Sequence, residues 1–168
     1  MTVASALEAV AVAIVPLGLA VCAAAGIDQA GLLSFVVVTV SLAAFFASFE
    51  HRRPRLRDTM PIVVLASLAA AGRILFAPIP DFKPVSAIAI VAGASFGRQA
   101  GFLVGALAAL VSNFFFGQGA WTPWQMYAWG MVGYGAAFVA KACGDGAGGE
   151  ADGGGRTWPL YAYGFVSG

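Results

Sequence analysis

The chain has 168 residues, of which 60% are hydrophobic and 10% are charged, and its formal net charge is +1. A soluble domain usually carries about 25% charged residues, so this sequence has too little polar surface to cover a core in water. The composition favours a membrane protein that contacts the lipid bilayer. The low net charge argues against a nucleic-acid partner.

Apolar stretches of nearly membrane-spanning length recur along the chain, since a helix needs roughly 20 such residues to cross a bilayer. They predict six helices, at 8–25, 32–49, 60–78, 85–96, 101–116 and 124–140. A further apolar stretch begins at Trp158 and stops early, so we expect a fragment of a longer protein, incomplete at its C-terminus. The predicted fold class is all-α: a polytopic membrane helical bundle of about six transmembrane helices plus the start of another.

Lysine and arginine predict the orientation of this bundle. A basic loop, 51–57, separates a two-helix N-terminal membrane hairpin, 1–50, from a second membrane region, 58–168. If six helices alternate sides, one side holds Arg52, Arg53, Arg55, Arg57, Arg98, Lys141 and Arg156, and the other holds only Lys83. Because cytoplasmic loops are rich in Lys and Arg, we expect a multi-pass protein of the cell membrane with a cytoplasmic N-terminus.

Motifs for metal binding, and most of those for catalysis, are missing from the sequence. Cys22 and Cys143 form no CxxC pair, and both are predicted to be free thiols. There is no HExxH motif and no pair of membrane carboxylates, and the single histidine, His51, lies in the basic loop. We therefore predict a protein that is not an enzyme and that needs neither a metal nor a cofactor.

Small residues recur at every fourth position in the predicted helix 101–116 and just before it, at Gly97, Gly101, Gly105 and Ala109. In lipid, small residues let two helix backbones approach closely, so this pattern predicts helix packing within the chain. Ala66 and Ala70 form a second pair with the same spacing. For that pair, packing within the chain and contact with a partner both stay open.

Polar and aromatic residues gather around the two loops that are predicted to lie outside. Arg73 lies near the outer end of its helix. Its side chain either extends toward the membrane surface or pairs with a neighbouring group in a structural role, or else it contacts a substrate. The other candidate substrate-binding residues are Asp81, Phe82, Lys83, Asn113, Gln118, Trp121, Thr122, Trp124 and Gln125. The tryptophans fit an interfacial aromatic belt, whereas the neighbouring amides and hydroxyl fit a ligand pocket.

Five segments carry a further pattern: Ala66-Ser-Leu-Ala-Ala-Ala-Gly-Arg73, Pro80-Asp-Phe-Lys-Pro84, Gly97-Arg-Gln-Ala-Gly101, Ser112-Asn-Phe-Phe-Phe-Gly117 and Trp121-Thr-Pro-Trp-Gln-Met126. Together they resemble the substrate-binding S components of energy-coupling factor (ECF) transporters. The resemblance implies a membrane subunit that captures a vitamin or related micronutrient outside the cell. Such a subunit delivers its small-molecule substrate by docking on a transmembrane T component and two ATPase subunits.

The resemblance also assigns residues. Ala66 and Ala70 match the AxxxA motif that contacts the T component, and the loop 79–84 matches the lid of the pocket. The substrate-facing region is matched by Asn113, Gln118, Trp121, Thr122 and Gln125. The hairpin 1–50 is additional to the family's plan.

Two other classes of function stay open at this point. One is a membrane-embedded enzyme acting on lipid or prenyl substrates, against which the missing catalytic constellations argue. The other is a membrane scaffold or sensor without a small ligand, against which the cluster of Trp, Gln and Asn argues.

Overall fold

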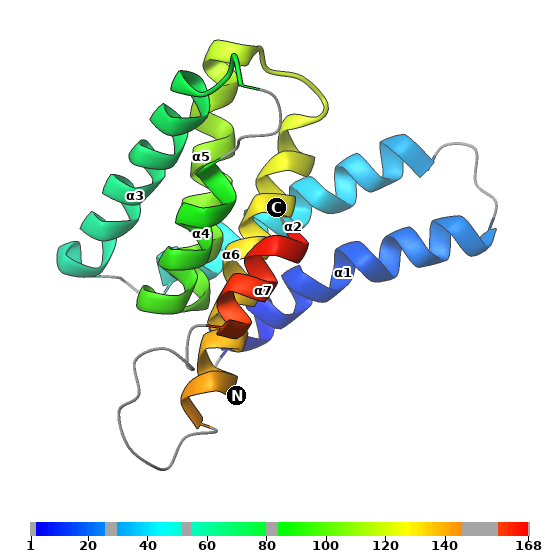
Figure 1. The fold of residues 1–168 in the computed structure, drawn as a ribbon. Coiled ribbons are helices and arrows are strands. Elements are labelled where there is room, and N and C mark those ends of the chain that lie inside the picture. Colours follow the sequence, from blue (N-terminus) through cyan, green and yellow to red (C-terminus); the bar gives the residue numbers. More distant parts are fainter. Residues whose placement is uncertain (1–2, 26–29, 52–54, 80–83, 146–157, 168) are drawn as a thin grey trace. The chain divides into compact units, whose positions relative to one another are not determined.

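The computed structural model describes residues 3–25, 30–51, 55–79, 84–145 and 158–167, and all regular secondary structure in these residues is helical (Figure 1). The helices are α1 (Val3–Ala25), α2 (Ala30–His51), α3 (Leu56–Leu75), α4 (Pro84–Phe96), α5 (Arg98–Phe116), α6 (Thr122–Asp145) and α7 (Trp158–Ser167). The all-α prediction is therefore confirmed for the described residues.

The chain divides into two compact units, Met1–Leu56 and Arg57–Gly168. In the first unit, α1 and α2 pack against each other as a helical hairpin. The second unit holds the rest of the helices. It contains every residue that was predicted from the sequence to bind substrate, and it is the part that concerns function.

Helices α4, α5 and α6 pack against one another and form the centre of the second unit, with α7 against α4 and α6. Their backbones come close where side chains are absent: Gly101 lies against the backbones of Gly93 and Gly133, and Gly105 lies against that of Trp129. Ala109 is also buried. Gly97 takes no part in this packing, because nothing lies within 4 Å of where its Cβ would be. With a φ of 91°, it forms the break between α4 and α5.

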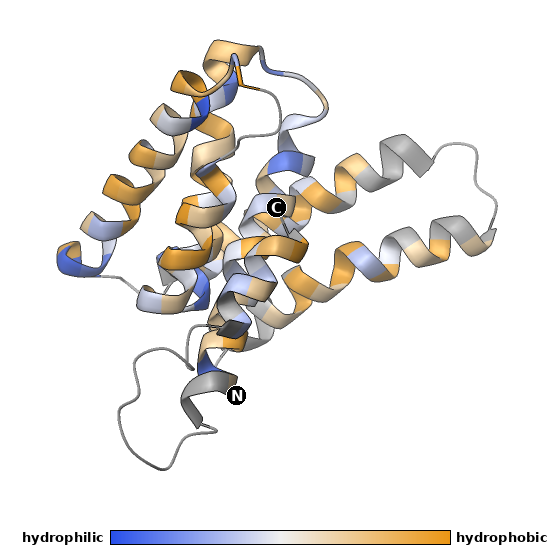
Figure 2. Ribbon diagram, viewed as in Figure 1, coloured by the Kyte–Doolittle hydropathy of each residue, from blue (hydrophilic) through white to orange (hydrophobic). Residues whose placement is uncertain are grey.

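Helix α3 turns its small residues inward and its large apolar residues outward. Ala69 packs in a buried cluster with Val85 of α4 and Ala108 of α5. The outward residues Val64 and Leu68 are 63% and 57% exposed, and Figure 2 shows hydrophobic colouring along most of the helix between hydrophilic ends. A helix in water has the opposite arrangement, so the surroundings of α3 are expected to be apolar.

Within the described residues, two helices, α3 and α5, are long and apolar enough to cross a membrane. Of the most apolar part of α5, 61% is buried, as it would also be in the core helix of a soluble protein, whereas for α3 the figure is only 22%. Helix α3 therefore carries most of the evidence for a membrane location. Helix α4 is also apolar, but its 13 residues are too few to cross a bilayer.

Candidate functional site

A polar network connects the last turn of α3 with the last turns of α5. Arg73 of α3 donates hydrogen bonds from Nη1 to Ser112 Oγ at 2.6 Å and to Asn113 Oδ1 at 2.8 Å. Both acceptors are buried, with Ser112 at 0% and Asn113 at 1% exposed. Ser112 in turn donates to the carbonyl oxygen of Ala108 at 2.6 Å, which fixes its hydroxyl in place.

Asn113 extends the network to the start of α6. Its Nδ2 donates to Thr122 Oγ1 at 3.1 Å and to Gln125 Oε1 at 2.8 Å, so both amide hydrogens are used. The Thr122 hydroxyl donates to Gln118 Oε1 at 3.0 Å, in the loop before α6. Asn113 is therefore the residue that joins α3, α5, the following loop and α6, and its side-chain hydrogen-bonding groups all have partners.

The positive charge of Arg73 is stabilised without an acidic partner among the residues that the structure describes. Its guanidinium carbon lies 4.8 Å from the ring centroid of Phe116 and 4.5 Å from that of Trp129. Aromatic faces attract cations, and the C-terminal ends of helices carry partial negative charge. Arg73 lies at the end of α3 and contacts the end of α5, so both effects act on it.

The structure brings together several residues that the sequence predicts to bind substrate: Arg73, Asn113, Gln118, Thr122 and Gln125. Trp121 is 55% exposed and its ring lies against Gly119, while Trp124 is partly buried. Trp121 contacts the network through its backbone, because its carbonyl oxygen accepts a hydrogen bond from the Gln125 N–H at 3.0 Å. Asp81, Phe82 and Lys83 lie outside the described residues.

Three members of the site were not predicted as such. Ser112 directly precedes Asn113 on α5, and Phe116 follows Asn113 by three residues. Trp129 follows Gln125 by four residues, which places both on the same face of α6. Helical spacing from the predicted polar residues is therefore the signal that could have found the two aromatic rings.

Ala66 and Ala70 are buried, with only 4% and 2% of their surfaces exposed. They lie on the same inward side of α3 as Ala69. In this conformation the side chains of Ala66 and Ala70 are not accessible to a partner protein. Contact with a partner along α3 would fall instead on the outward residues such as Val64 and Leu68.

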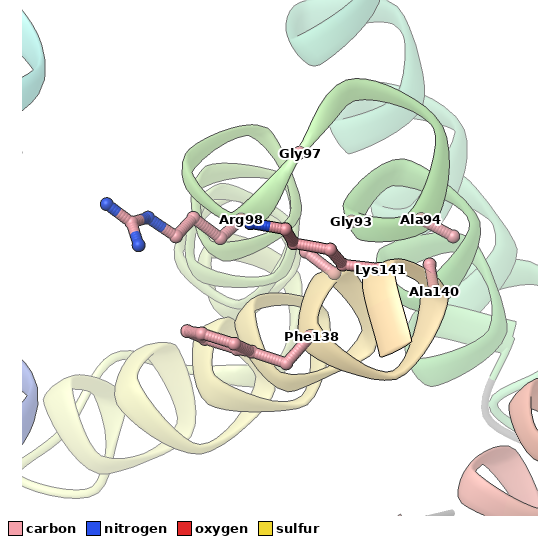
Figure 3. Close-up of a pocket in the computed structure, with 8 residues that line it drawn as sticks. Gly93, Ala94, Gly97, Arg98, Phe138, Ala140 and Lys141 are labelled. Atoms are coloured by element: carbon pink, nitrogen blue, oxygen red, sulfur yellow. The ribbon is translucent and has the colours of Figure 1, made fainter. Parts of the chain in front are cut away.

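A separate pocket of about 400 Å³ lies near the beginning of α5 and the end of α6. Its lining residues are Gly93, Ala94, Gly97, Arg98, Ala137, Phe138, Ala140 and Lys141. Figure 3 shows the Lys141 side chain running toward the start of α5, whereas the guanidinium of Arg98 points away from the pocket. Fifteen residues of α5, or about 22 Å, separate Arg98 from Asn113, so the pocket and the polar network are distinct.

The second unit is thus an all-helical structure with a buried polar network at one end of α5. The chain belongs to the family of unknown function DUF6580, whose model matches residues 53–151. The matched range contains the whole network from Arg73 to Trp129. No curated protein and no solved structure matches the chain.

Proposed function

We propose that this chain is the substrate-capture subunit of an ECF-type importer, a multi-pass protein of the cell membrane with a cytoplasmic N-terminus. It binds a vitamin or related micronutrient on the outer face, at the Arg73–Asn113 network. It is not itself an enzyme. It passes its substrate on by docking on a T component and two ATPase subunits.

The observation that carries this proposal is the concentration of buried polar groups at one end of an apolar helical unit. Buried polar side chains are costly unless they are paired, and ionisable groups in membrane helices commonly mark ligand or ion sites. A few polar groups amid apolar and aromatic walls are typical of a small-molecule site. In the charge-based orientation, this end of α5 faces the outside, where a capture subunit meets its substrate.

A membrane scaffold without a ligand is the second candidate, and one observation favours it. Asn113, Thr122 and Gln125 satisfy one another's hydrogen bonds, so they could serve only to fix the packing of α5 against α6. A binding experiment separates the two functions.

We expect the purified chain in detergent to bind one member of a vitamin panel saturably. Trp129 lies 4.5 Å from the Arg73 guanidinium carbon, so binding should change tryptophan fluorescence. Gln125→Ala should weaken that binding roughly tenfold, the effect of one lost hydrogen bond. Lys141→Ala, near the end of α6 and away from the network, should leave it unchanged. No response to any vitamin by folded protein would favour the scaffold.

Docking on the T component should depend on the outward face of α3. We expect Leu68→Trp to reduce co-purification with a T component and its ATPases, because a larger ring on an exposed surface disturbs a close helix contact. Ala70→Leu is a poorer test, since Ala70 is buried and a larger side chain there disturbs the fold itself. Undiminished assembly of a folded Leu68→Trp protein would contradict this docking surface.

A further inference from the structure

We infer that the ligand of this site carries a carboxylate, bound by the Nε–Nη2 edge of Arg73. This inference rests on the proposed function and narrows it, because it names the chemical group that the captured molecule must have. It follows from which hydrogen-bond donors of Arg73 are already used and which are not.

The guanidinium of arginine has five N–H donors and no acceptor. In this structure the two donors of Nη1 are directed to Ser112 Oγ and Asn113 Oδ1. Among the residues that the structure describes, none accepts a hydrogen bond from Nε or Nη2. These two nitrogens form one edge of the guanidinium, and their parallel N–H groups match the two oxygens of a carboxylate.

The surroundings of Arg73 favour this edge, and not the flat faces of the guanidinium, as the place for a ligand. Phe116 and Trp129 lie within 5 Å of the guanidinium carbon, so aromatic rings already occupy space over the group. Arg73 is only partly buried, which leaves part of the side chain reachable. Because Nη1 is held by two buried acceptors, the free edge is fixed before a ligand arrives, and this lowers the cost of binding.

The balance of charge points the same way. No acidic residue in the described part of the chain forms an ion pair with Arg73. A cation among apolar helices is costly, and rings and helix ends offset that cost only in part. A ligand carboxylate would place a negative charge beside the guanidinium and offset more of that cost.

The experiment compares carboxylates with neutral molecules of nearly the same shape. The full chain in detergent is titrated with three pairs: nicotinate and nicotinamide, biotin and biotinamide, and pantothenate and panthenol. A fourth pair, pyridoxal 5′-phosphate and pyridoxal, tests a phosphate instead. We expect the acid of one carboxylate pair to bind at least about tenfold more tightly than its neutral partner, as the loss of a charge-assisted hydrogen bond predicts.

Arg73→Lys provides the matched variant, because lysine keeps the positive charge but lacks the two parallel N–H donors of the Nε–Nη2 edge. It should weaken binding of the acid by about 10- to 100-fold and weaken binding of the neutral partner clearly less. If this variant does not fold, the comparison of acid with neutral partner on the unchanged chain still decides the matter.

Each remaining outcome counts against a different claim. Equal binding of an acid and its neutral partner overturns the carboxylate inference and leaves the capture function standing. Selective binding of the phosphate ester also overturns it, in favour of another anion. Failure of folded protein to bind any of these molecules contradicts the capture function itself, and the inference then falls with it.

Discussion

Replacement of Gly101 by alanine is expected to destabilise the second unit by about 1–3 kcal/mol or more, the usual cost of overpacking a close contact. A Cβ at this position would lie 2.6 Å from the Cα of Gly93 and 2.7 Å from the carbonyl carbon of Gly133. These are backbone atoms, so no side chain can rotate away. The new methyl group must push α4 and α6 away from α5.

The matched control is Gly164→Ala in α7. A Cβ there would meet only Ile90 Cδ1, at 3.6 Å, which is ordinary van der Waals contact. Since alanine favours a helix over glycine by up to about 1 kcal/mol, this variant should be neutral or slightly stabilising. Thermal unfolding in detergent, followed by circular dichroism, measures both. Equal midpoints for the two variants would show that the close approach of α5 to α4 and α6 is wrong.

Replacement of Asn113 by leucine is expected to cost roughly 2–4 kcal/mol, because buried polar partners are then left without hydrogen bonds. Leucine has the same number and branching of side-chain heavy atoms as asparagine, so the substitution leaves no cavity and removes the hydrogen bonds. One acceptor of Arg73 Nη1 disappears, and Gln125 Oε1 and Thr122 Oγ1 lose a donor. The same unfolding measurement in detergent gives the size of the effect.

Asn113→Asp tells whether Arg73 is the partner that matters most. The carboxylate still accepts from Arg73 and adds an opposite charge, and the Thr122 hydroxyl and the Gln125 amide can both turn to donate to it. This variant should therefore lose clearly less stability than Asn113→Leu. An aspartate as damaging as leucine would mean that the contact with Arg73 contributes little.

The positions of the helices followed closely from the apolar pattern, and the last residues of α1, α4 and α5 were predicted correctly, but the first residues of the helices were not. Helix α5 was predicted from residue 101 but begins at Arg98, because the preceding Gly97 has a positive φ that no helix contains. Helix α6 was predicted from residue 124 but begins at Thr122. Pro123 is compatible with that start, since proline is tolerated in the first turn, where its missing N–H has no partner to lose.

The members of the site were predictable in type but not in pairing. Asn113 stood out because an amide in an apolar helix needs a partner, and Gln125 because it lies among the polar residues beside the two tryptophans. Their contact with Arg73 could not be predicted, since Arg73 and Asn113 are 40 residues apart and meet only through the packing of α3 on α5. The spacing of Ala66 and Ala70 predicted a close contact, but a small-residue pattern does not tell an inner face from an outer one.

Two glycines limit the length of the central helix. Gly97 and Gly117, with φ angles of 91° and 96°, lie immediately before and after α5, and neither can be incorporated as a further helical residue without changing its conformation. The 19 residues between them give a rod of about 28 Å, close to the roughly 30 Å hydrocarbon thickness of a bilayer. In a bilayer, α5 can adapt to a thicker or thinner membrane by changing its tilt or the local thickness of the lipid, but not by adding a helical turn. Any such tilt moves Asn113, and with it the whole polar network, relative to the membrane surface.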